Sequence, residues 1–191
     1  AFGYTYESLR EAILPMAKNG GEGTSAMGID TPLAALASDH QPLFNYFKQL
    51  FAQVTNPPID SIREKVVTST TVYIGEDGNL LEERAENCKV LKVNNPILTN
   101  TDLMKIKAMN RPGFHAATVS LLYYKGTHLD LVLDRLAVAV DRAYREGANI
   151  VILSDRGVDE NHAAIPSLLA VSALEQYLVR TKKRTAVSMI L

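Results

Sequence analysis

Residues 149–157 read NIVILSDRG, a short apolar run that is followed at once by polar residues and a glycine. The four aliphatic residues from Ile150 to Leu153 are typical of a strand that is buried on both faces of a parallel sheet. Helical patterns precede and follow this run, over residues 129–145 and 166–180. The stretch therefore predicts the buried strand of an α/β sheet.

An alternation of strands and helices extends from residue 89 to the last residue. We expect strands over 89–93, 118–124, 149–153 and 185–191, with helices over 100–109, 129–145 and 166–180 between them. This order implies right-handed crossovers and parallel strands, and it has too few units for a closed eight-stranded barrel. The predicted fold class is α/β: an open, mostly parallel sheet flanked by helices and half-barrel-like in shape, with a helical N-terminal segment and a β-hairpin.

The helical N-terminal segment, residues 1–66, is predicted to be an arm with breaks. Residues 6–14 space their apolar side chains as a helix does. Asp30 and Thr31 can cap a short helix over 32–37 that has proline in its first turn. A further helix over residues 42–51 would carry an apolar stripe made of Leu43, Phe44, Phe47, Leu50 and Phe51.

The β-hairpin is predicted over residues 68–82. Its strands would be residues 70–74 and 79–81, joined by a glycine-containing turn over 75–78. We expect one domain over residues 1–191, in which the helical arm over 1–66 and the hairpin approach lead into an α/β core over 67–191.

The sharpest break in the arm lies in residues 51–67, FAQVTNPPIDSIREKVV. The two prolines remove two backbone donors and push the residue before them out of the α region, so a helix must stop there. Asp60 or Ser61 can then cap a new helix. The stretch is either a corner between packed segments or a binding loop that uses Thr55 and Asn56, and the breaker residues alone favour the corner.

Composition argues against several classes of function. The chain has 20 Lys and Arg residues against 21 Asp and Glu residues, and we interpret its longest basic run, Lys182-Lys183-Arg184, as a solvated turn. Nucleic-acid binding needs a basic face and is not expected. No apolar run approaches the roughly 20 residues that span a bilayer, so no membrane partner is expected. The single cysteine excludes an internal disulfide and favours a reducing compartment, so we expect a cytoplasmic protein.

No catalytic, cofactor-binding or metal-binding pattern emerges from the residues. Gly23 and Gly28 have the spacing of a phosphate-binding loop, but Ile29 and Asp30 stand where that motif needs Lys and Ser or Thr. The four histidines are dispersed, and one cysteine cannot hold an iron–sulfur cluster. We interpret Cys88 as a buried and inert thiol.

The best candidate site is the loop after the buried strand, because ligands of open α/β sheets bind at the carboxyl ends of the strands. There, Asp155 and Arg156 could hold a polar ligand. The alternative is structural: these two side chains pair or cap, and Gly157 supplies a turn with positive φ. The turn accounts for these residue types by itself, which favours the structural interpretation.

Several long motifs resemble one known family. They are SAMGIDTPLAALA (25–37), QPLFNYFKQLFAQVTNPPIDSIREKVV (41–67), GEDGNLLEE (75–83), NPILTN (95–100), GF (113–114) and ILSDRGVDENHAAIPSLLAVSALEQYLV (152–179). Together they resemble the central domain of glutamate synthase (the large or alpha chain) over essentially the whole sequence. Ser61 stands where the family commonly has proline and Ala26 where it commonly has serine, and neither change disturbs the frame of the motif.

The resemblance implies a role inside a larger enzyme. Glutamate synthase moves the amide nitrogen of glutamine through an internal ammonia channel to 2-oxoglutarate and reduces the product to glutamate. In that family a glutamine amidotransferase domain with an N-terminal cysteine and an FMN-binding barrel domain with an iron–sulfur cluster flank the central domain, which is not known as a seat of catalysis. The implied partners are these two domains of the same polypeptide, with no cofactor in the present chain and a plastid location if the parent is a plant-type enzyme.

The chain begins with Ala1 instead of a methionine, so we expect a processed chain or a piece of a longer one that does not make glutamate by itself. Two alternatives remain: a stand-alone binding protein that uses the loop after the buried strand, and an interaction module that exposes an apolar patch such as the 42–51 stripe. For a connecting domain, the candidate channel or interdomain residues are Ser25, Asp30, Thr31, Thr55, Asn56, Asp155 and Arg156.

Overall fold

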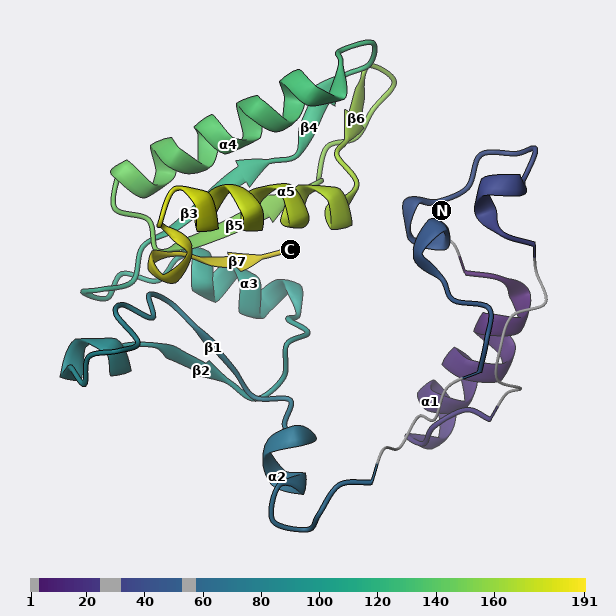
Figure 1. The fold of residues 1–191 in the computed structure, drawn as a ribbon, viewed down its shortest axis with the longest axis horizontal. Helices are drawn as coiled ribbons and strands as arrows, with labels where there is room; N and C mark the ends of the chain where they lie inside the picture. Colours follow the sequence, from purple (N-terminus) through teal and green to yellow (C-terminus); the bar gives the residue numbers. More distant parts are fainter. Residues whose placement is uncertain (1–3, 25–31, 53–57) are drawn as a thin grey trace. The chain divides into compact units, whose positions relative to one another are not determined.

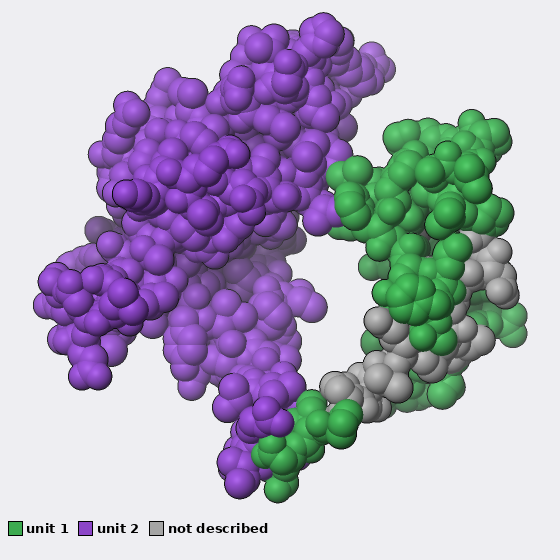
Figure 2. All heavy atoms as spheres, in the orientation of Figure 1, with its two compact units in different colours: residues 1–61 green, residues 62–191 purple. Residues whose placement is uncertain are grey.

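A computed structural model describes residues 4–24, 32–52 and 58–191 of the chain (Figure 1). The chain divides into two compact units, Ala1–Ser61 and Ile62–Leu191, which Figure 2 shows in different colours. The expectation of one domain over residues 1–191 stays a prediction.

The helices among the described residues of the first unit are short. A π-helical segment, η1 (Ser8–Ile13), continues into α1 (Leu14–Asn19), which ends at Gly20 in the left-handed conformation with φ 63°. A helix is therefore present where the sequence predicts one over 6–14, and it extends further. The other two predicted helices are only short 3-10 turns, η2 (Ala34–Leu36) and η3 (Leu43–Phe47).

These shortened helices have a physical cause in the lack of packing. None of the described side chains of the first unit is buried, and most of the stability of a short helix comes from packing of its apolar face. Phe44, Phe47 and Phe51, members of the predicted stripe, are more than half exposed. Aromatic side chains also lose rotamer freedom in a helix, so local propensity does not compensate.

The second unit begins at Ile62, after the two prolines. Residues 53–57 lie outside the described residues, so the choice between a corner and a binding loop stays open. The helix predicted to follow is present as α2 (Glu64–Val67), but Arg63 occupies its capping position and makes no side-chain cap. The helix therefore begins later than a cap at Asp60 or Ser61 would place it.

A β-hairpin is present in the second unit, with one strand different from the prediction. β1 (Val72–Ile74) pairs antiparallel with β2 (Leu91–Val93), so that Ile74 lies opposite Leu91. The prediction that residues 79–81 form the second strand is wrong, because side-chain hydrogen bonds fold those residues into a turn. The strand predicted over 89–93 is confirmed, but it belongs to this hairpin and not to the parallel sheet.

The parallel sheet has three strands with β5 in the centre. β3 (Ala116–Ser120) and β7 (Ser188–Ile190) pair with the two edges of β5 (Ile150–Ser154), and both pairings are parallel. The prediction of an open α/β sheet flanked by helices is confirmed. The residues of β5 from Ile150 to Leu153 are buried, as the apolar run predicts.

Alternate side chains of β5 enter two different cores. Val151 and Leu153 pack with the helices α4 (Leu129–Arg145) and α5 (Ser167–Arg180). Ile150 and Ile152 pack on the opposite face, with Ile74 of β1 and Ile106 of α3 (Asn100–Lys107). Burial of one such aliphatic side chain contributes roughly 1.5–3 kcal/mol to the stability of the fold. The elements that cover each face of β5 therefore both contribute to stability.

The helix α4 has the bounds that the sequence predicts. Its buried side chains recur every three or four residues and form one stripe, which faces the sheet. They are Val132, Leu136, Val140 and Ala143; the side chain of Asp141, next to this stripe, is also buried. No helix within the described ranges is both long and apolar enough to cross a membrane.

A second, antiparallel ribbon joins β4 (Leu122–Tyr124) to β6 (His162–Ala164). The sequence predicts one strand over 118–124, but the backbone changes partner at Leu121, whose N–H donates to the Ser154 carbonyl at 2.8 Å. β6 is not predicted because His-Ala-Ala lacks the β-branched and aromatic residues that are enriched in strands.

An ion pair fixes α4 to the connection between α5 and β7. Lys183 Nζ donates to Asp141 Oδ1 at 2.7 Å, and these two side chains are 22% and 12% exposed. Burial raises the pKa of Asp141, but hydrogen bonds from Lys183 and Tyr177 outweigh it and hold the pKa below the usual value. Arg184 Nε likewise contacts Glu175 Oε2 at 2.6 Å. A turn is therefore present at residues 182–184 as predicted, but the Lys183 side chain is largely removed from solvent.

We expect Lys183→Met to lower the free energy of unfolding by about 2 to 3 kcal/mol, because the carboxylate of Asp141 stays buried after losing its main partner. Arg145 Nη2, at 3.6 Å, is the remaining cation. Urea unfolding at pH 7 measures the change. Lys182→Met is the matched control on the same turn, since Lys182 is exposed, and it should stay within about 0.5 kcal/mol of the wild type. An equal loss in both variants would contradict this role for the pair.

Candidate functional site

A pocket of about 500 Å³ lies at the carboxyl ends of the parallel strands, which we call the carboxyl edge of the sheet. We call the opposite side, where these strands begin, the amino edge. Residues at the end of β7, the hairpin strands and the start of α3 line it, together with Arg156. This is the edge at which open α/β sheets bind ligands, so the candidate loop after β5 lies where the sequence places it.

Arg156 is held by a contact distant in sequence. Its Nη2 donates to Oδ1 of Asn100 at 2.7 Å, and Asn100 is the first residue of α3. Thr99 caps that helix by accepting from the N–H of Asp102 at 3.2 Å, while the Asp102 carboxylate accepts from the N–H of Thr99. The guanidinium is thus fixed beside a capped helix start.

The structural interpretation of the loop is confirmed in part. Gly157 has φ 100°, as the predicted turn requires. The expected pairing of Asp155 with Arg156 is wrong, because the Arg156 guanidinium donates to Asn100 instead. Across the described residues, the carboxylate of Asp155 has no hydrogen bond or ion pair.

Further along the same loop, Asp159 holds a turn through hydrogen bonds. Its Oδ1 accepts from the backbone N–H of Asn161 at 2.8 Å and of His162 at 2.7 Å, and His162 Nδ1 lies 2.8 Å away. These hydrogen bonds, with that from Asn161 the largest, hold the pKa of Asp159 below the usual value. The ring of His162 also packs against Tyr124, with 4.3 Å between centroids. Asp159 therefore fixes the start of β6.

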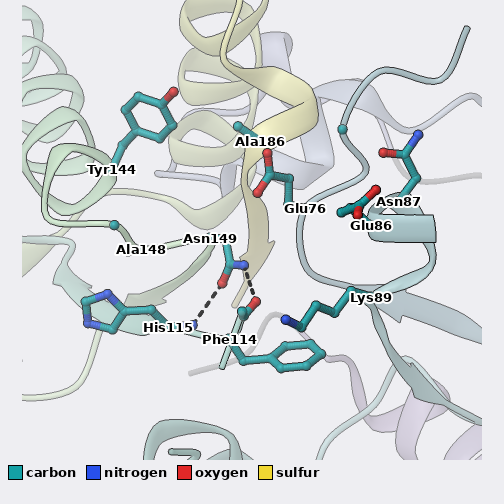
Figure 3. Close-up of a pocket in the computed structure, with 13 residues that line it drawn as sticks. Glu76, Glu86, Asn87, Lys89, Phe114, His115, Tyr144, Ala148, Asn149 and Ala186 are labelled. Carbon is teal, nitrogen blue, oxygen red and sulfur yellow. Dashed lines mark hydrogen bonds between the residues drawn. The ribbon is translucent and has the colours of Figure 1, made fainter. Parts of the chain in front are cut away.

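A second pocket, which we call the amino-edge pocket, lies at the opposite edge of the sheet and has a volume of about 520 Å³ (Figure 3). The Asn149 side chain crosses its base: Nδ2 donates to the Gly113 carbonyl at 2.7 Å, and Oδ1 accepts from the His115 N–H at 3.0 Å. These bonds join the segments before β3 and β5. Lys89 and Glu76 extend toward the same hollow from the connection between β1 and β2.

The amino-edge pocket is polar and carries charges of both signs. Glu86 lines it together with Glu76 and Lys89, and no ion pair within the described part of the chain engages these three side chains. Sequence reasoning did not find them, because the segment around Glu76 was interpreted as a hairpin turn. The available signal was the density of carboxylates over residues 76–86.

Cys88 lies next to this pocket, at the end of the short helix η4 (Ala85–Cys88). The thiol is exposed, so the interpretation of Cys88 as a buried residue is wrong. The cause is its place in the connection between β1 and β2, outside the sheet. Over the described ranges, no group of three or more His, Cys, Asp or Glu residues could hold a metal ion.

The remaining candidate residues cannot be placed. Ser25, Asp30, Thr31, Thr55 and Asn56 lie outside the described residues. Of the seven candidates, the structure therefore places Asp155 and Arg156, both at the carboxyl edge of the sheet.

Comparison with known proteins resolves the family. A family model described as "Glutamate synthase central domain" matches residues 1–191. The chain belongs to the glutamate synthase central domain family. The resemblance seen in the sequence motifs is confirmed.

Three curated relatives match the whole central domain. The "Glutamate synthase [NADPH] large chain" of Bacillus subtilis is 43% identical over 190 residues, which are 100% of this chain and 12% of that protein. The "Ferredoxin-dependent glutamate synthase 2" of a Synechocystis strain is 42% identical, with the same shares. The "Glutamate synthase [NADH]" of Schizosaccharomyces pombe is 38% identical over 100% of this chain and 9% of its own length. The central domain therefore spans about a tenth of the length of the relatives it matches.

The turn at Asp159 gives the central domain an acid-sensitive contact. Because the folded carboxyl has the lower pKa, the turn stabilises the fold fully above the unfolded pKa of about 3.9, and the contribution is lost as the pH falls through the folded pKa. Asp159→Asn keeps an acceptor oxygen but cannot titrate. We expect the thermal midpoint of the wild type to fall further between pH 6 and pH 3 than that of Asp159→Asn.

Asp155→Asn is the control for this comparison, because it removes a carboxylate from the same loop without touching the turn. Its midpoint should fall with acid as that of the wild type does. If Asp159→Asn loses as much stability on acidification as the wild type, the turn at Asp159 does not supply the acid-sensitive contact.

Proposed function

We propose that this chain is the connecting domain of a glutamate synthase and contributes no catalytic group of its own. The parent enzyme transfers the amide nitrogen of glutamine through an internal ammonia channel to 2-oxoglutarate and reduces the product to glutamate. The observation that carries the proposal is the family match over all 191 residues, in relatives of which the matched region is only 9 to 12%. Proteins about ten times as long argue against the alternative of a stand-alone binding protein.

The surface of the second unit supports a domain that packs against others. Several of its large apolar side chains are almost fully exposed. Ile62 is 86% exposed and Ile97 is 83% exposed. Burial of these side chains against neighbouring domains would remove apolar surface from water.

The neighbours that we propose are a glutamine amidotransferase domain and an FMN-binding barrel domain of the same polypeptide. In this proposal FMN and an iron–sulfur cluster belong to the barrel domain, and the central domain holds neither. We propose the cytoplasm as the location, or a plastid if the parent is a plant-type enzyme.

We also propose that polar residues of the chain border the ammonia route or the interdomain contacts. The chemical reason is that passage of ammonia needs small or polar walls that exclude bulk water and needs no titratable group. The residues proposed for these roles are Ser25, Asp30, Thr31, Thr55, Asn56, Asp155 and Arg156.

The isolated chain, supplied with glutamine, 2-oxoglutarate and a reductant, is expected to form no glutamate, because the proposed reaction centres lie in other domains. The complete polypeptide under the same conditions serves as the positive control. The measurement is glutamate formed with time, determined by chromatography. Turnover by the isolated chain above the background without protein would refute the proposal that it contributes no catalytic group.

In the complete enzyme, Thr55→Phe tests the channel proposal, because a phenyl ring would narrow a route lined by a small polar side chain. We expect more glutamine to be hydrolysed per glutamate formed than in the wild type, with ammonia released to solvent. Thr55→Ser keeps the hydroxyl and the small volume, and it should leave this ratio unchanged. An unchanged ratio in Thr55→Phe would remove Thr55 from the route.

A further inference from the structure

The connection between β1 and β2 presents two leucines to solvent. We call residues 76–87 of this connection the acidic loop. Leu80 is 73% exposed and Leu81 is 95% exposed, so neither contributes to a core of the domain. Figure 1 shows this connection extending well beyond the strands that it joins.

Side-chain hydrogen bonds hold the acidic loop in one shape. Asn87 Nδ2 donates to the carbonyl of Asn79 at 2.9 Å and to that of Glu82 at 2.8 Å. Asn79 Oδ1 accepts from the N–H of Leu81 at 3.1 Å, and its Nδ2 donates to Glu82 Oε1 at 2.8 Å. The backbone on both sides of the two leucines is therefore fixed.

A second set of contacts attaches the acidic loop to the β7 side of the sheet. The N–H groups of Asp77 and Gly78 donate to the Thr185 carbonyl at 2.8 and 3.3 Å. Gly78 has φ 67°, and a Cβ at this position would lie 2.4 Å from Asn87 Oδ1, so the turn requires glycine. The two leucines are thus held outward by the fold. A preorganised element of this kind loses little conformational freedom when it binds a partner.

The charge around the leucines is mainly negative. Residues 76–89 contain five carboxylates and two cationic side chains, and one of the cations, Arg84, pairs with Glu82 within the loop. Glu76 and Glu86 of the acidic loop line the amino-edge pocket together with Lys89 (Figure 3). The complementary surface is an apolar pocket with Lys or Arg on its rim.

We propose that the acidic loop is a docking element for another domain of the same polypeptide. Leu80 and Leu81 enter an apolar pocket of that domain, and basic side chains on the rim of that pocket face the carboxylates of the acidic loop, which outnumber the cations Arg84 and Lys89. The proposal rests on the proposed function, because it takes the partner from the same glutamate synthase chain. A second copy of the loop is a poor partner, since a symmetric contact would bring like charges together.

Cys88 supplies a probe for this contact in the complete enzyme, because its thiol is exposed in the domain and adjoins the acidic loop. The experiment measures the rate at which a maleimide labels Cys88, read by mass spectrometry of the peptide that contains it. We expect labelling in the native enzyme to be several-fold slower than in Leu81→Asp. The separate variant Leu81→Met keeps an apolar side chain at this position, so Cys88 should be labelled as slowly as in the native enzyme.

Two further variants separate docking from general destabilisation. Asn87→Ala removes the bonds that shape the acidic loop and leaves both leucines in place, so Cys88 should react faster than in the wild type. Val138→Asp places the same charge at an exposed position of α4 and should leave the slow rate unchanged. An equal increase in Val138→Asp and Leu81→Asp would overturn the proposal.

The labelling rate of Cys88 in the wild-type enzyme also tests the docking proposal. If Cys88 in the native wild-type enzyme reacts as fast as in the urea-unfolded enzyme, the loop is not covered and the docking proposal fails. Protection that appears only on raising the enzyme concentration would assign the loop to a second copy and overturn the assignment to the same chain. Glutamate formation is measured in parallel: its persistence with an uncovered loop rejects the docking element while leaving the proposed function intact.

Discussion

The second unit depends on the burial of β5 on both faces and both edges. A strand alternates its side chains between two faces, so a run of four buried aliphatic residues demands a cover on each face. α4 and α5 cover Val151 and Leu153 on one side. On the other side, α3 and β1 cover Ile150 and Ile152. This one short stretch of sequence therefore requires a cover on each face, and these four elements supply the two covers.

The packing of α3 and β1 on Ile150 and Ile152 involves fewer buried side chains than the packing of α4 and α5 on the other face. The contacts that hold β1 in this position also determine where the acidic loop begins. Ser188 of β7 binds both backbone groups of Gly75, accepting from its N–H at 3.0 Å and donating to its carbonyl at 2.8 Å. These bonds place the end of β1, with Ile74, over the sheet. The chain then leaves the core at Gly75 and enters the acidic loop, so packing of the hairpin fixes where the loop begins.

Local signals predicted the parts of the fold that local chemistry determines. The bounds of α4 follow from its apolar period and the glycine after it, and β5 follows from its aliphatic run. The partner of β1 and the ribbon with β6 were missed, because strand pairing is decided by contacts far apart in sequence. The same holds for the candidate site: Arg156 was found from its place after β5, but its partner Asn100 is 56 residues away. The amino-edge pocket is assembled from several separate segments, so no single motif marks it.

The two edges of the sheet differ in the charge that they carry. At the carboxyl edge, Asn100 holds Arg156, and Asp159 accepts from the turn that starts β6. At the amino edge, Glu76 and Glu86 have no ion pair within the described part of the chain, and two exposed leucines stand beside them. Asp155 at the carboxyl edge also has no hydrogen bond or ion pair within the described residues, so the feature that sets the amino edge apart is the density of carboxylates over residues 76–86. In our proposal a basic surface complements this charge, although the usual rule for ligand binding in α/β sheets favours the carboxyl edge.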